Sequence, residues 1–298
     1  MRALAFGEIL WDIIDGKEYI GGAPFNCAAH LARMGAESAI VSALGEDERG
    51  AKALLEVERL NIRTDFIGRR SHLPTGTVNV SLDLQGKPQY EIREGSAWDA
   101  IHLDTEQKKA LGNEEWDVII FGSLAQRREG NRKTLREVIE TAAPKEVFFD
   151  VNLRLDYYSR NIIAESLRMA TILKLNDEEA PLISEMLYGE VVPARAFCER
   201  MEMDWSIHTT VLTRGKDGAS VYRQGRYIHV PVIDVRVVDT VGAGDSFSAA
   251  FLYGYFMTGD LEQGARLAAE VSSFVTSRNG AVPPYSKEIK TVLAKISG

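Results

Sequence analysis

Short apolar runs alternate with longer amphipathic stretches along this chain, and this alternation restricts the possible folds more than any other feature. The first runs are RALAFGEI and SAIVSALG, and they are followed by FNCAAHLARMG and RGAKALLEVERLN, where apolar residues recur at helical spacing. The pattern resumes with WDVIIFGS, EVFFDVN, ATILKLN and HTTVLTRG. Continuous apolar runs of this length are typical of parallel strands covered on both faces. The alternation therefore predicts an α/β fold with a mostly parallel central sheet between helices.

One segment departs from this pattern. Residues 75–83, TGTVNVSLD, alternate strictly, with Val78 and Leu82 on one side and polar residues from Thr77 to Asp83 on the other. Strict alternation is typical of a sheet with one exposed face. The segment therefore predicts a second, small sheet.

We expect this small sheet to act as a lid over an opening at the edge of the main sheet. Its strands are predicted within about 15–22, which contains KEYIGG, and within about 64–98. No proline-rich or low-complexity linker separates these segments from the rest of the chain. Residues 1–298 are therefore expected to form a single domain.

Charge and cysteine content exclude several classes of protein. The chain of 298 residues has a formal net charge of −8, so we expect neither nucleic acid nor a membrane surface as a partner. Glu8 and Asp12 interrupt the apolar N-terminus and no small-residue cleavage site follows, which argues against a signal peptide and a membrane span. Cys27 and Cys198 fit packed thiols in a reducing compartment. A cytoplasmic protein is expected.

The most informative short stretch is DTVGAGDSF, residues 239–247. Its glycines allow close approach of another group, and helical spacing follows directly. The N–H groups of Gly242, Ala243 and Gly244 would then lie at a helix N-terminus, where they can bind an anion such as phosphate. The alternative is an ordinary turn in which Asp245 only caps the helix. Neither the Walker A loop nor the dinucleotide fingerprint matches this stretch.

With this stretch, the chain resembles the ribokinase-like (PfkB) carbohydrate kinases. Their C-terminal signature resembles DTVGAGDSF, and their N-terminal signature resembles GGAPFNCAAHLARMG, residues 21–35. NDEEA at 176–180 is similar to the family's N-x-x-E element, and TRGKDG at 213–218 is similar to its T-x-G-x-x-G turn. These four elements follow the family's order and cover essentially the whole chain. The resemblance implies a ribokinase-like three-layer α/β/α fold and an ATP-dependent sugar kinase.

The same resemblance implies the catalytic roles. Asp245 would take the proton of the sugar hydroxyl, while the amides of Gly242, Ala243 and Gly244 would stabilise charge on the transferred phosphoryl group. The positive helix end is expected to lower the pKa of Asp245 and to make it a weaker base. Late proton transfer resolves this conflict, because the carboxylate then needs only to be ionised and close.

The nucleotide is expected beside the two middle motifs. Asn176 and Glu179 can face one opening and reach Mg²⁺ through water. They can also form a helix N-cap and a capping box, and both roles can hold together. Thr213, Gly215 and Gly218 are implied to lie beside the phosphates or ribose of ATP, although a plain strand-to-hairpin turn would also account for them.

The sugar is expected at the carboxyl ends of the parallel strands. Asp12, assigned to the end of the first strand, and Asn26, at the start of the first helix, would bind sugar hydroxyls. A solvated turn residue and a helix cap are the alternatives for these two positions. Gly21 and Gly22 would let the backbone approach the ligand, and a tight turn is compatible with that role.

Two further stretches bear on the identity of the sugar. REGSAWD, residues 93–99, is similar to the R-x-x-S-A segment of fructokinases, and DVNLR, residues 150–154, resembles their D-x-N-x-R strand end. The candidate sugar-binding residues in these stretches are Arg93, Ala97, Asn152 and Arg154. Ordinary surface arginines are the alternative for the two basic residues.

The choice of sugar depends on one further position. The two arginines also occur in 2-keto-3-deoxygluconate kinases, which tend to carry tyrosine where this chain has Glu91. An additional acid would repel a sugar acid, so fructose is favoured. The alternatives are that sugar-acid kinase, a kinase for ribose or a nucleoside, and a non-catalytic sugar-binding regulator.

The C-terminal region adds expectations on ions and partners. SRNGAVPP resembles the loop that holds a monovalent cation such as K⁺ in several family members, and the candidates here are Asp239, Val241 and Gly280. Ala268 and Ala269 stand where many relatives carry asparagine beside the adenine, which leaves the base preference open. Besides a small-molecule sugar and a nucleotide, the expected partner is a second copy of the chain, because lid strands often pair between subunits in this family.

Overall fold

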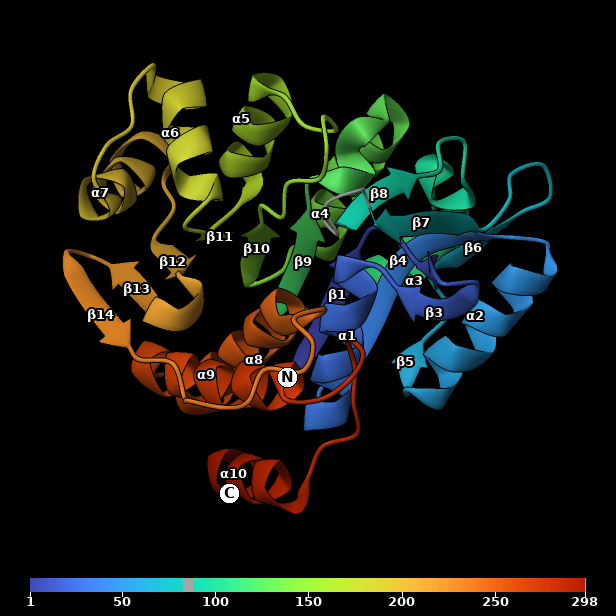
Figure 1. The fold of residues 1–298 in the computed structure, drawn as a ribbon. Coiled ribbons are helices and arrows are strands. Elements are labelled where there is room, and N and C mark those ends of the chain that lie inside the picture. The colour runs from blue at the N-terminus through green and yellow to red at the C-terminus, as the bar shows by residue number, and fades with distance from the viewer. Residues whose placement is uncertain (83–87, 298) are drawn as a thin grey trace.

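Two β-sheets form the frame of the structure, a computed structural model that describes residues 1–82 and 88–297 (Figure 1). The strands of the large sheet are β1 (Arg2–Phe6), β4 (Glu37–Gly45), β5 (Ile62–Arg63), β6 (Ile67–Arg70), β9 (Val118–Gly122), β10 (Glu146–Asp150), β11 (Ile172–Asn176), β12 (Thr209–Thr213), β13 (Ala219–Arg223) and β14 (Arg226–Val230). Their order is β14-β13-β12-β11-β10-β9-β1-β4-β5, and β6 also pairs with β4. Among the described strands of this sheet, the pairs β12–β13 and β13–β14 are antiparallel and the others are parallel. The predicted mostly parallel sheet is confirmed.

Helices cover both faces of the large sheet, as Figure 1 shows. One face carries α3 (Thr105–Gly112), α4 (Glu129–Ala142), α5 (Arg160–Met169), α6 (Glu179–Tyr188) and α7 (Ala194–Trp205). The other face carries α1 (Ala23–Met34), α2 (Glu48–Arg59), α8 (Ala243–Thr258), α9 (Leu261–Thr276) and α10 (Lys287–Ser297). Short 3₁₀ turns are η1 (Ala97–Ala100), η2 (Leu124–Arg127) and η3 (Gly215–Asp217). In the part of the chain that the structure describes, no helix is long and apolar enough to cross a membrane.

Strands of the large sheet send alternate side chains into separate cores. On β9, Ile119 and Phe121 pack with α3 to α7, whereas Val118 and Ile120 pack with α1, α8 and α9. Successive side chains of a strand point to opposite faces, so a strand covered on both sides is apolar at every position. This explains why the sequence of these strands reads as continuous apolar runs.

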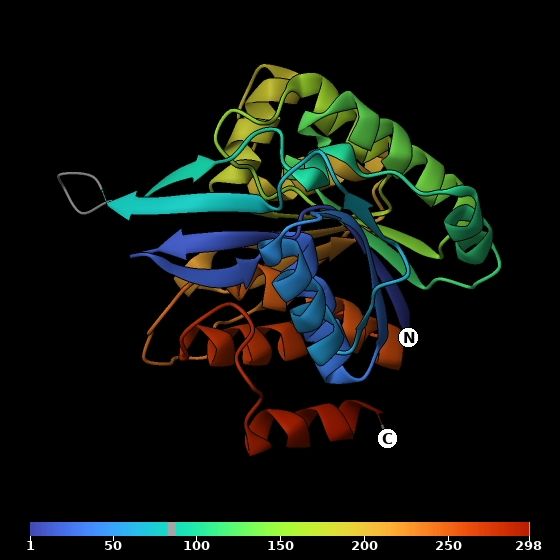
Figure 2. The ribbon, with the colours of Figure 1, turned by 90° about the vertical axis from the view of Figure 1, so that its right-hand side faces the viewer.

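The small sheet consists of β2 (Leu10–Ile14), β3 (Lys17–Gly21), β7 (Gly76–Leu82) and β8 (Pro88–Ile92), in the order β3-β2-β7-β8. In Figure 2 its two hairpins extend together to the left, away from the helical layers. The separate small sheet is therefore present as predicted. Asp83, the last polar position of the alternating pattern, lies outside the described residues.

The bounds of the small sheet correct the sequence prediction in two places. Residues 10–14 belong to it as β2, which pairs with β7, whereas residues 67–70 pair with β4 of the large sheet as β6. The chain leaves the large sheet at Gly7, whose φ of 146° permits a sharp change of direction. The stretch ALAFGEILW around Gly7 is apolar except for Glu8, so it does not reveal that one strand ends and another begins.

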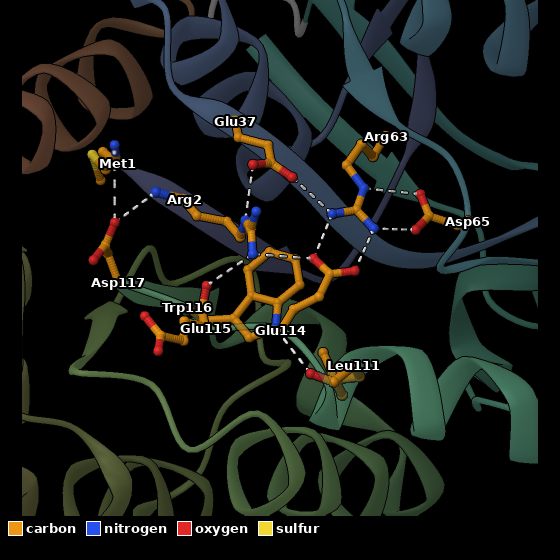
Figure 3. Close-up of polar contacts among 10 residues, drawn as sticks. All are labelled: Met1, Arg2, Glu37, Arg63, Asp65, Leu111, Glu114, Glu115, Trp116 and Asp117. Carbon is orange, nitrogen blue, oxygen red and sulfur yellow. Dashed lines mark hydrogen bonds and ion pairs between the residues drawn. The ribbon is translucent and has the colours of Figure 1, made fainter.

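A network of charged side chains ties β5 to the segment that precedes β9 (Figure 3). Arg63 donates to both carboxylate oxygens of Glu114 at 2.6 and 2.8 Å, and to Glu37 at 3.0 Å. It also donates to Asp65, and its guanidinium lies 5.5 Å from the centre of the Phe66 ring. One cation therefore holds three carboxylates together.

Arg63→Ala is expected to lower the free energy of unfolding by about 2 kcal/mol, because all three carboxylates lose this cation and networks contribute more than isolated surface pairs. Glu37 and Glu114 keep a second cation in Arg2. Urea denaturation measures the change. The matched control is Lys133→Ala, which breaks an exposed pair with Glu129 on α4 and should change stability much less. Equal effects of the two variants would contradict the importance of the network.

Candidate active site

Loop 242–245 lies where α8 begins, at the carboxyl ends of the parallel strands. Asp245 is in the first turn of α8, and Asn26 of α1 donates from Nδ2 to its Oδ2 at 2.8 Å. Gly244 is exposed, and Gly242 and Ala243 are half-buried, so core packing does not close the loop off from solvent. Asn26 is the fourth residue of α1 rather than its cap. The structure thus brings together the two motifs that lie farthest apart in the sequence.

Gly242 has no room for a side chain. Its φ is 74°, and a Cβ atom added there would lie 2.7 Å from both Cα and the carbonyl oxygen of Ala281. Positive φ of this size favours glycine, and the contact with backbone atoms excludes any larger residue. The segment after α9 therefore supports the loop from behind.

A buried ion pair that the sequence analysis missed lies beneath the same loop. Lys174 of β11 donates from Nζ to the two carboxylate oxygens of Asp150 at 2.9 and 3.0 Å, and Ser248 donates to Asp150 at 2.7 Å. A Cβ atom added at Gly244 would lie 3.2 Å from Nζ. The available signal was a lysine inside the apolar run ILKLN, which a buried strand tolerates only if the charge is paired.

Burial raises the pKa of Asp245 to about 6. The hydrogen bond from Asn26 opposes this increase, Asp150 adds to it, and the charges of Lys174 and Arg154 oppose it. The pKa is therefore raised, whereas the position at the helix end was expected to lower it, and loss of solvent is the largest cause. The carboxyl is still ionised at neutral pH, and it is a stronger base than an ordinary aspartate.

The charge of Arg154 acts on two further carboxyl groups of the site, those of Glu8 and Asp12. Burial raises the pKa of Glu8 to about 7 and that of Asp12 to about 6, while the charge of Arg154 lowers both. Glu8 accepts the N–H of Ala23 at 3.3 Å through Oε1, and among the described residues its buried Oε2 has no partner. Glu8 was missed, although a carboxylate in the apolar run FGEIL is a recognisable signal.

Asp12 reaches this region from β2 rather than from the end of the first strand, which corrects the sequence assignment. A Cβ atom at Gly21 would lie 2.4 Å from Oδ2 of Asp12. Gly22 has a φ of 114°, and a Cβ atom there would lie 2.3 Å from the carbonyl oxygen of Glu8. Gly21 thus makes room for the Asp12 carboxyl and Gly22 for the backbone of Glu8, so the glycine pair serves local packing directly.

The remaining candidates for sugar binding, Asn152, Ala97 and Arg93, lie in different environments. Asn152, with a φ of 40°, lines a small cavity together with Glu8 and Asp150. Ala97 is fully buried in the core, so its side chain is not brought to this region. The side chain of Arg93 is exposed.

Arg127, which the sequence analysis missed, fixes the segment that carries Arg93. It donates to both carboxylate oxygens of Asp99 at 2.7 Å and to the backbone carbonyl of Arg93 at 2.8 Å. Its guanidinium lies 4.0 Å from the ring centre of Trp98 and 4.7 Å from that of Tyr157. A buried arginine held in this way is rigid.

The nucleotide candidates lie side by side, because Asn176 pairs with Thr213 in the register of β11 and β12. Asn176 Oδ1 accepts the N–H of Glu179 at 2.8 Å, and Glu179 Oε2 accepts the N–H of Asn176 at 2.9 Å. Glu179 Oε1 accepts the N–H of Leu153 at 2.8 Å. The reciprocal hydrogen bonds of the capping-box alternative are therefore present, although α6 begins at Glu179 and Glu178 occupies the N-cap position.

The side chains at the start of α6 offer few free ligands for Mg²⁺. The oxygens of Asn176 and Glu179 already accept backbone N–H groups. Over residues 1–82 and 88–297, no group of three or more His, Cys, Asp or Glu side chains could hold a metal ion. These residues fit Mg²⁺ only through water, with the nucleotide phosphates as direct ligands.

The turn from β12 to β13 contains the other nucleotide candidates. Gly215 and Gly218 have φ values of 46° and 79°, and the N–H of Arg214 donates to the carbonyl of Gly218 at 2.8 Å. A Cβ atom at Gly218 would lie 2.2 Å from the carbonyl oxygen of Val230, whereas the space around Gly215 is open. The hairpin itself requires Gly218, and Gly215 stays accessible to a ligand.

Asp239 joins the two segments that were expected to hold a monovalent cation. Its Oδ1 accepts the N–H of Val241 and its Oδ2 accepts the N–H of Gly280, both at 3.0 Å. The three candidates are thus brought together. The side chain of Asp239 is engaged in fixing the two loops, so a cation would depend on backbone carbonyl oxygens.

Glu8 makes stability depend on pH. Its pKa is about 7 when folded against an ordinary 4.5, so between these values the folded state binds more protons than the unfolded state, and the free energy of unfolding falls as pH rises. In Glu8→Gln, the loss of stability between pH 5 and pH 8 should be smaller than in the wild type by about 2 kcal/mol. Urea denaturation at the two pH values tests this, and equal losses would contradict it.

Comparison with known proteins places this geometry in a family. The family model for pfkB family carbohydrate kinases matches residues 4–288. The uncharacterised sugar kinase PH1459 of Pyrococcus horikoshii is 29% identical, over 93% of this chain and 90% of that protein. The fructokinase of Klebsiella pneumoniae is 27% identical, over 96% of this chain and 97% of that protein.

Solved structures agree with the sequence relatives. The crystal structure of the Pyrococcus horikoshii kinase in complex with ATP has a TM-score of 0.84 and 26% identity, and covers 99% of both chains. A fructokinase from Xylella fastidiosa with bound ATP has a TM-score of 0.85 at 23% identity, over 100% of this chain and 99% of that one, and supports the fold alone.

The fold and the loop at the start of α8 therefore define a ribokinase-like kinase. The chain belongs to the pfkB family of carbohydrate kinases. The predicted ATP-dependent carbohydrate kinase is confirmed at this level.

Proposed function

We propose that this kinase transfers the γ-phosphoryl group of ATP to a hydroxyl of D-fructose, with Asp245 as the base. The observation that carries the proposal is the hydrogen bond between Asn26 and Asp245 beside the exposed Gly244. This bond occupies one carboxylate oxygen and leaves the other available for a hydroxyl. A base must lie within hydrogen-bond reach of the proton that it removes, and a rigid partner keeps it there.

Charge stabilisation is proposed for the groups around the same loop. The amides of Gly242, Ala243 and Gly244 would donate to the transferred phosphoryl group, and Lys174 would add positive charge beneath them. Mg²⁺, held by the phosphates and through water by Asn176 and Glu179, would neutralise further phosphate charge. Thr213, Gly215 and Gly218 would contact the nucleotide. Proton transfer to Asp245 completes the reaction.

Sugar binding is proposed for the region around Arg154. Asp12, Asn26, Asn152 and Arg154 would bind hydroxyl groups, with Gly21 and Gly22 shaping the wall. Glu8 is added to this set because its buried Oε2 has no partner among the described residues and can accept from a ligand. The carboxyl groups of Glu8, Asp12 and Asp245 favour a neutral polyol over a sugar acid, because negative charges repel one another.

Fructose is the first choice among neutral sugars. Fructokinases occur among the relatives that are 27–28% identical over most of their length, and a fructosamine kinase of Bacillus subtilis is 26% identical. The second candidate is a 2-keto-3-deoxygluconate kinase, which would pair Arg93 and Arg154 with the carboxylate of its substrate. Kinases for ribose or a nucleoside are further candidates on the same fold.

A coupled ADP-release assay tests the proposal with fructose, ribose, glucose, nucleosides and 2-keto-3-deoxygluconate as acceptors. We expect kcat/KM to be highest for fructose, and Asp245→Asn measured on the same sugar is the control for contaminating kinases. A preference for the sugar acid would replace fructose with the second candidate. If none of the acceptors in the panel supports ADP release, the whole assignment of substrate is rejected.

The small sheet is proposed as a lid that excludes water from the sugar, and as the contact between two subunits. Ile14, Tyr19 and Tyr90 are exposed on its strands, with relative exposures of 37%, 48% and 48%. Exposed apolar side chains that gather on one sheet suit a second copy of the chain. Sedimentation velocity is expected to give a dimer, and a monomer at micromolar concentration would reject the contact.

A monovalent cation such as K⁺ is proposed to bind at Asp239, Val241 and Gly280. Measuring kcat in K⁺ and in Na⁺ buffers tests this proposal.

A further inference from the structure

The face of α1 that carries Asn26 also carries His30, one turn further along the helix. His30 is fully buried, and none of the roles above uses it. Its Nε2 lies 2.9 Å from the carbonyl oxygen of Ala281, and its Nδ1 lies 2.7 Å from the hydroxyl of Tyr285. A carbonyl oxygen can only accept, so Nε2 carries the proton and Nδ1 accepts from Tyr285. His30 thus holds two points of the segment that follows α9.

Ala281 is also the residue that supports Gly242. The carbonyl oxygen of Ala281, which accepts from His30, would lie 2.7 Å from a Cβ atom at Gly242. Loop 242–245 therefore rests on the same backbone group that the imidazole holds. At the other end of the loop, Asn26 holds Asp245 at 2.8 Å. One face of α1 contacts both ends of the loop, directly at Asp245 and through Ala281 at Gly242.

We propose that His30 is a positioning residue for phosphoryl transfer, which holds Ala281 so that the amides of loop 242–245 point at the transferred group. The proposal rests on the proposed role of that loop. The N–H of Nε2 holds the Ala281 carbonyl, whereas an apolar residue at position 30 would leave this carbonyl free to shift. Donors displaced from the transferred group lose much of their effect on the rate.

The imidazole suits this task because it is uncharged. Burial lowers the pKa of His30 to about 4, and the hydrogen bond to Ala281 raises it while Arg33 lowers it. The ring also stacks on Tyr285, with ring centres 5.8 Å apart. The His30 side chain therefore keeps one protonation state and one orientation across the pH range in which Asp245 is ionised.

Two substitutions separate the positioning role from a general effect on folding. The amide nitrogen of glutamine reaches about as far as Nε2, so His30→Gln can still donate to Ala281, whereas His30→Asn reaches only about as far as Nδ1. We expect His30→Asn to lower kcat by about tenfold or more, with KM for the sugar and for ATP changed by less than about twofold. His30→Gln should keep kcat within about threefold of the wild type.

Tyr285→Phe is the matched control. It removes the partner of Nδ1 and leaves a buried acceptor unpaired, but it keeps the bond from Nε2 to Ala281. Its melting temperature should fall while kcat stays within about threefold of the wild type. A tenfold loss of kcat in Tyr285→Phe, or equal kcat values for His30→Asn and His30→Gln, would overturn the proposal.

Amide hydrogen exchange gives a readout that does not depend on the acceptor sugar. Peptides covering 238–246 and 278–285 should exchange faster in His30→Asn than in the wild type and in His30→Gln, while peptides from β9 and β10 should be unchanged. Uniformly faster exchange, or no change in these two peptides, would refute positioning by His30. Failure of the sugar panel would leave this readout intact and would count only against the proposed substrate.

Discussion

Asp245→Asn is expected to lower kcat by about 10³-fold, with KM for the sugar within a few-fold of the wild type. Asparagine has the shape of aspartate and can offer its side-chain oxygen to Nδ2 of Asn26, so the local geometry is kept. What disappears is the carboxylate oxygen that would take the proton. The ADP-release assay with saturating ATP and the best acceptor measures kcat, and calorimetry measures sugar binding.

The matched control for this variant is Asp260→Asn, at the N-cap of α9, where the oxygen that accepts from the N–H of Glu262 is preserved. It should leave kcat unchanged. An unchanged kcat in Asp245→Asn would reject the assignment of the base.

In the wild type, kcat/KM should fall as pH drops below about 6, because the pKa of Asp245 is about 6 and only the ionised carboxyl acts as a base.

Gly242→Ala is expected to lower kcat by about 10²-fold or more, because the loop can accept a Cβ atom only by moving its amides away from the transferred group. The added atom would lie 2.7 Å from backbone atoms of Ala281, and the φ of 74° is unfavourable for alanine. Backbone atoms cannot turn aside as a flexible side chain can. The steady-state rate with fructose or the best acceptor measures the loss.

Gly259→Ala separates backbone strain from displacement of the loop. Gly259 ends α8 with a φ of 71°, and a Cβ atom there would meet nothing within 4 Å. Both substitutions therefore carry similar conformational strain, of about 1 kcal/mol, but only one pushes on Ala281. Gly259→Ala should lose stability and keep kcat. A similar loss of kcat in both variants would show that strain alone, and not the position of loop 242–245, governs the rate.

The fold could be predicted to a large extent from the sequence. Continuous apolar runs such as WDVIIFGS indicated buried parallel strands, and the alternation over residues 75–82 indicated a second sheet with an exposed face. The boundary between the sheets could not be predicted at residues 7–14, because β1 and β2 are both largely apolar and only Gly7, Glu8 and Ile9 separate them. Asp12 was therefore assigned to the wrong strand.

The candidate site could be predicted where glycines or motif residues marked it. Asn26 and Asp245 were both identified, but their contact joins residues 219 positions apart and depends on how α1 packs against α8. Lys174, Glu8 and His30 were not selected. A lone polar residue in an apolar run does not reveal which buried partner satisfies it.

The class of fold, the family and the residues of the loop at the start of α8 could be read from the amino-acid sequence, because they depend on local periodicity and on glycines with a particular backbone conformation. The pKa of Asp245 depends on the three-dimensional packing, because loss of solvent raises it although the helix end was expected to lower it. Only the tertiary structure, likewise, set Ala281 behind Gly242 and His30 behind Ala281. Burial and long-range contact are properties of the packed chain, since they arise from residues that are distant in the sequence.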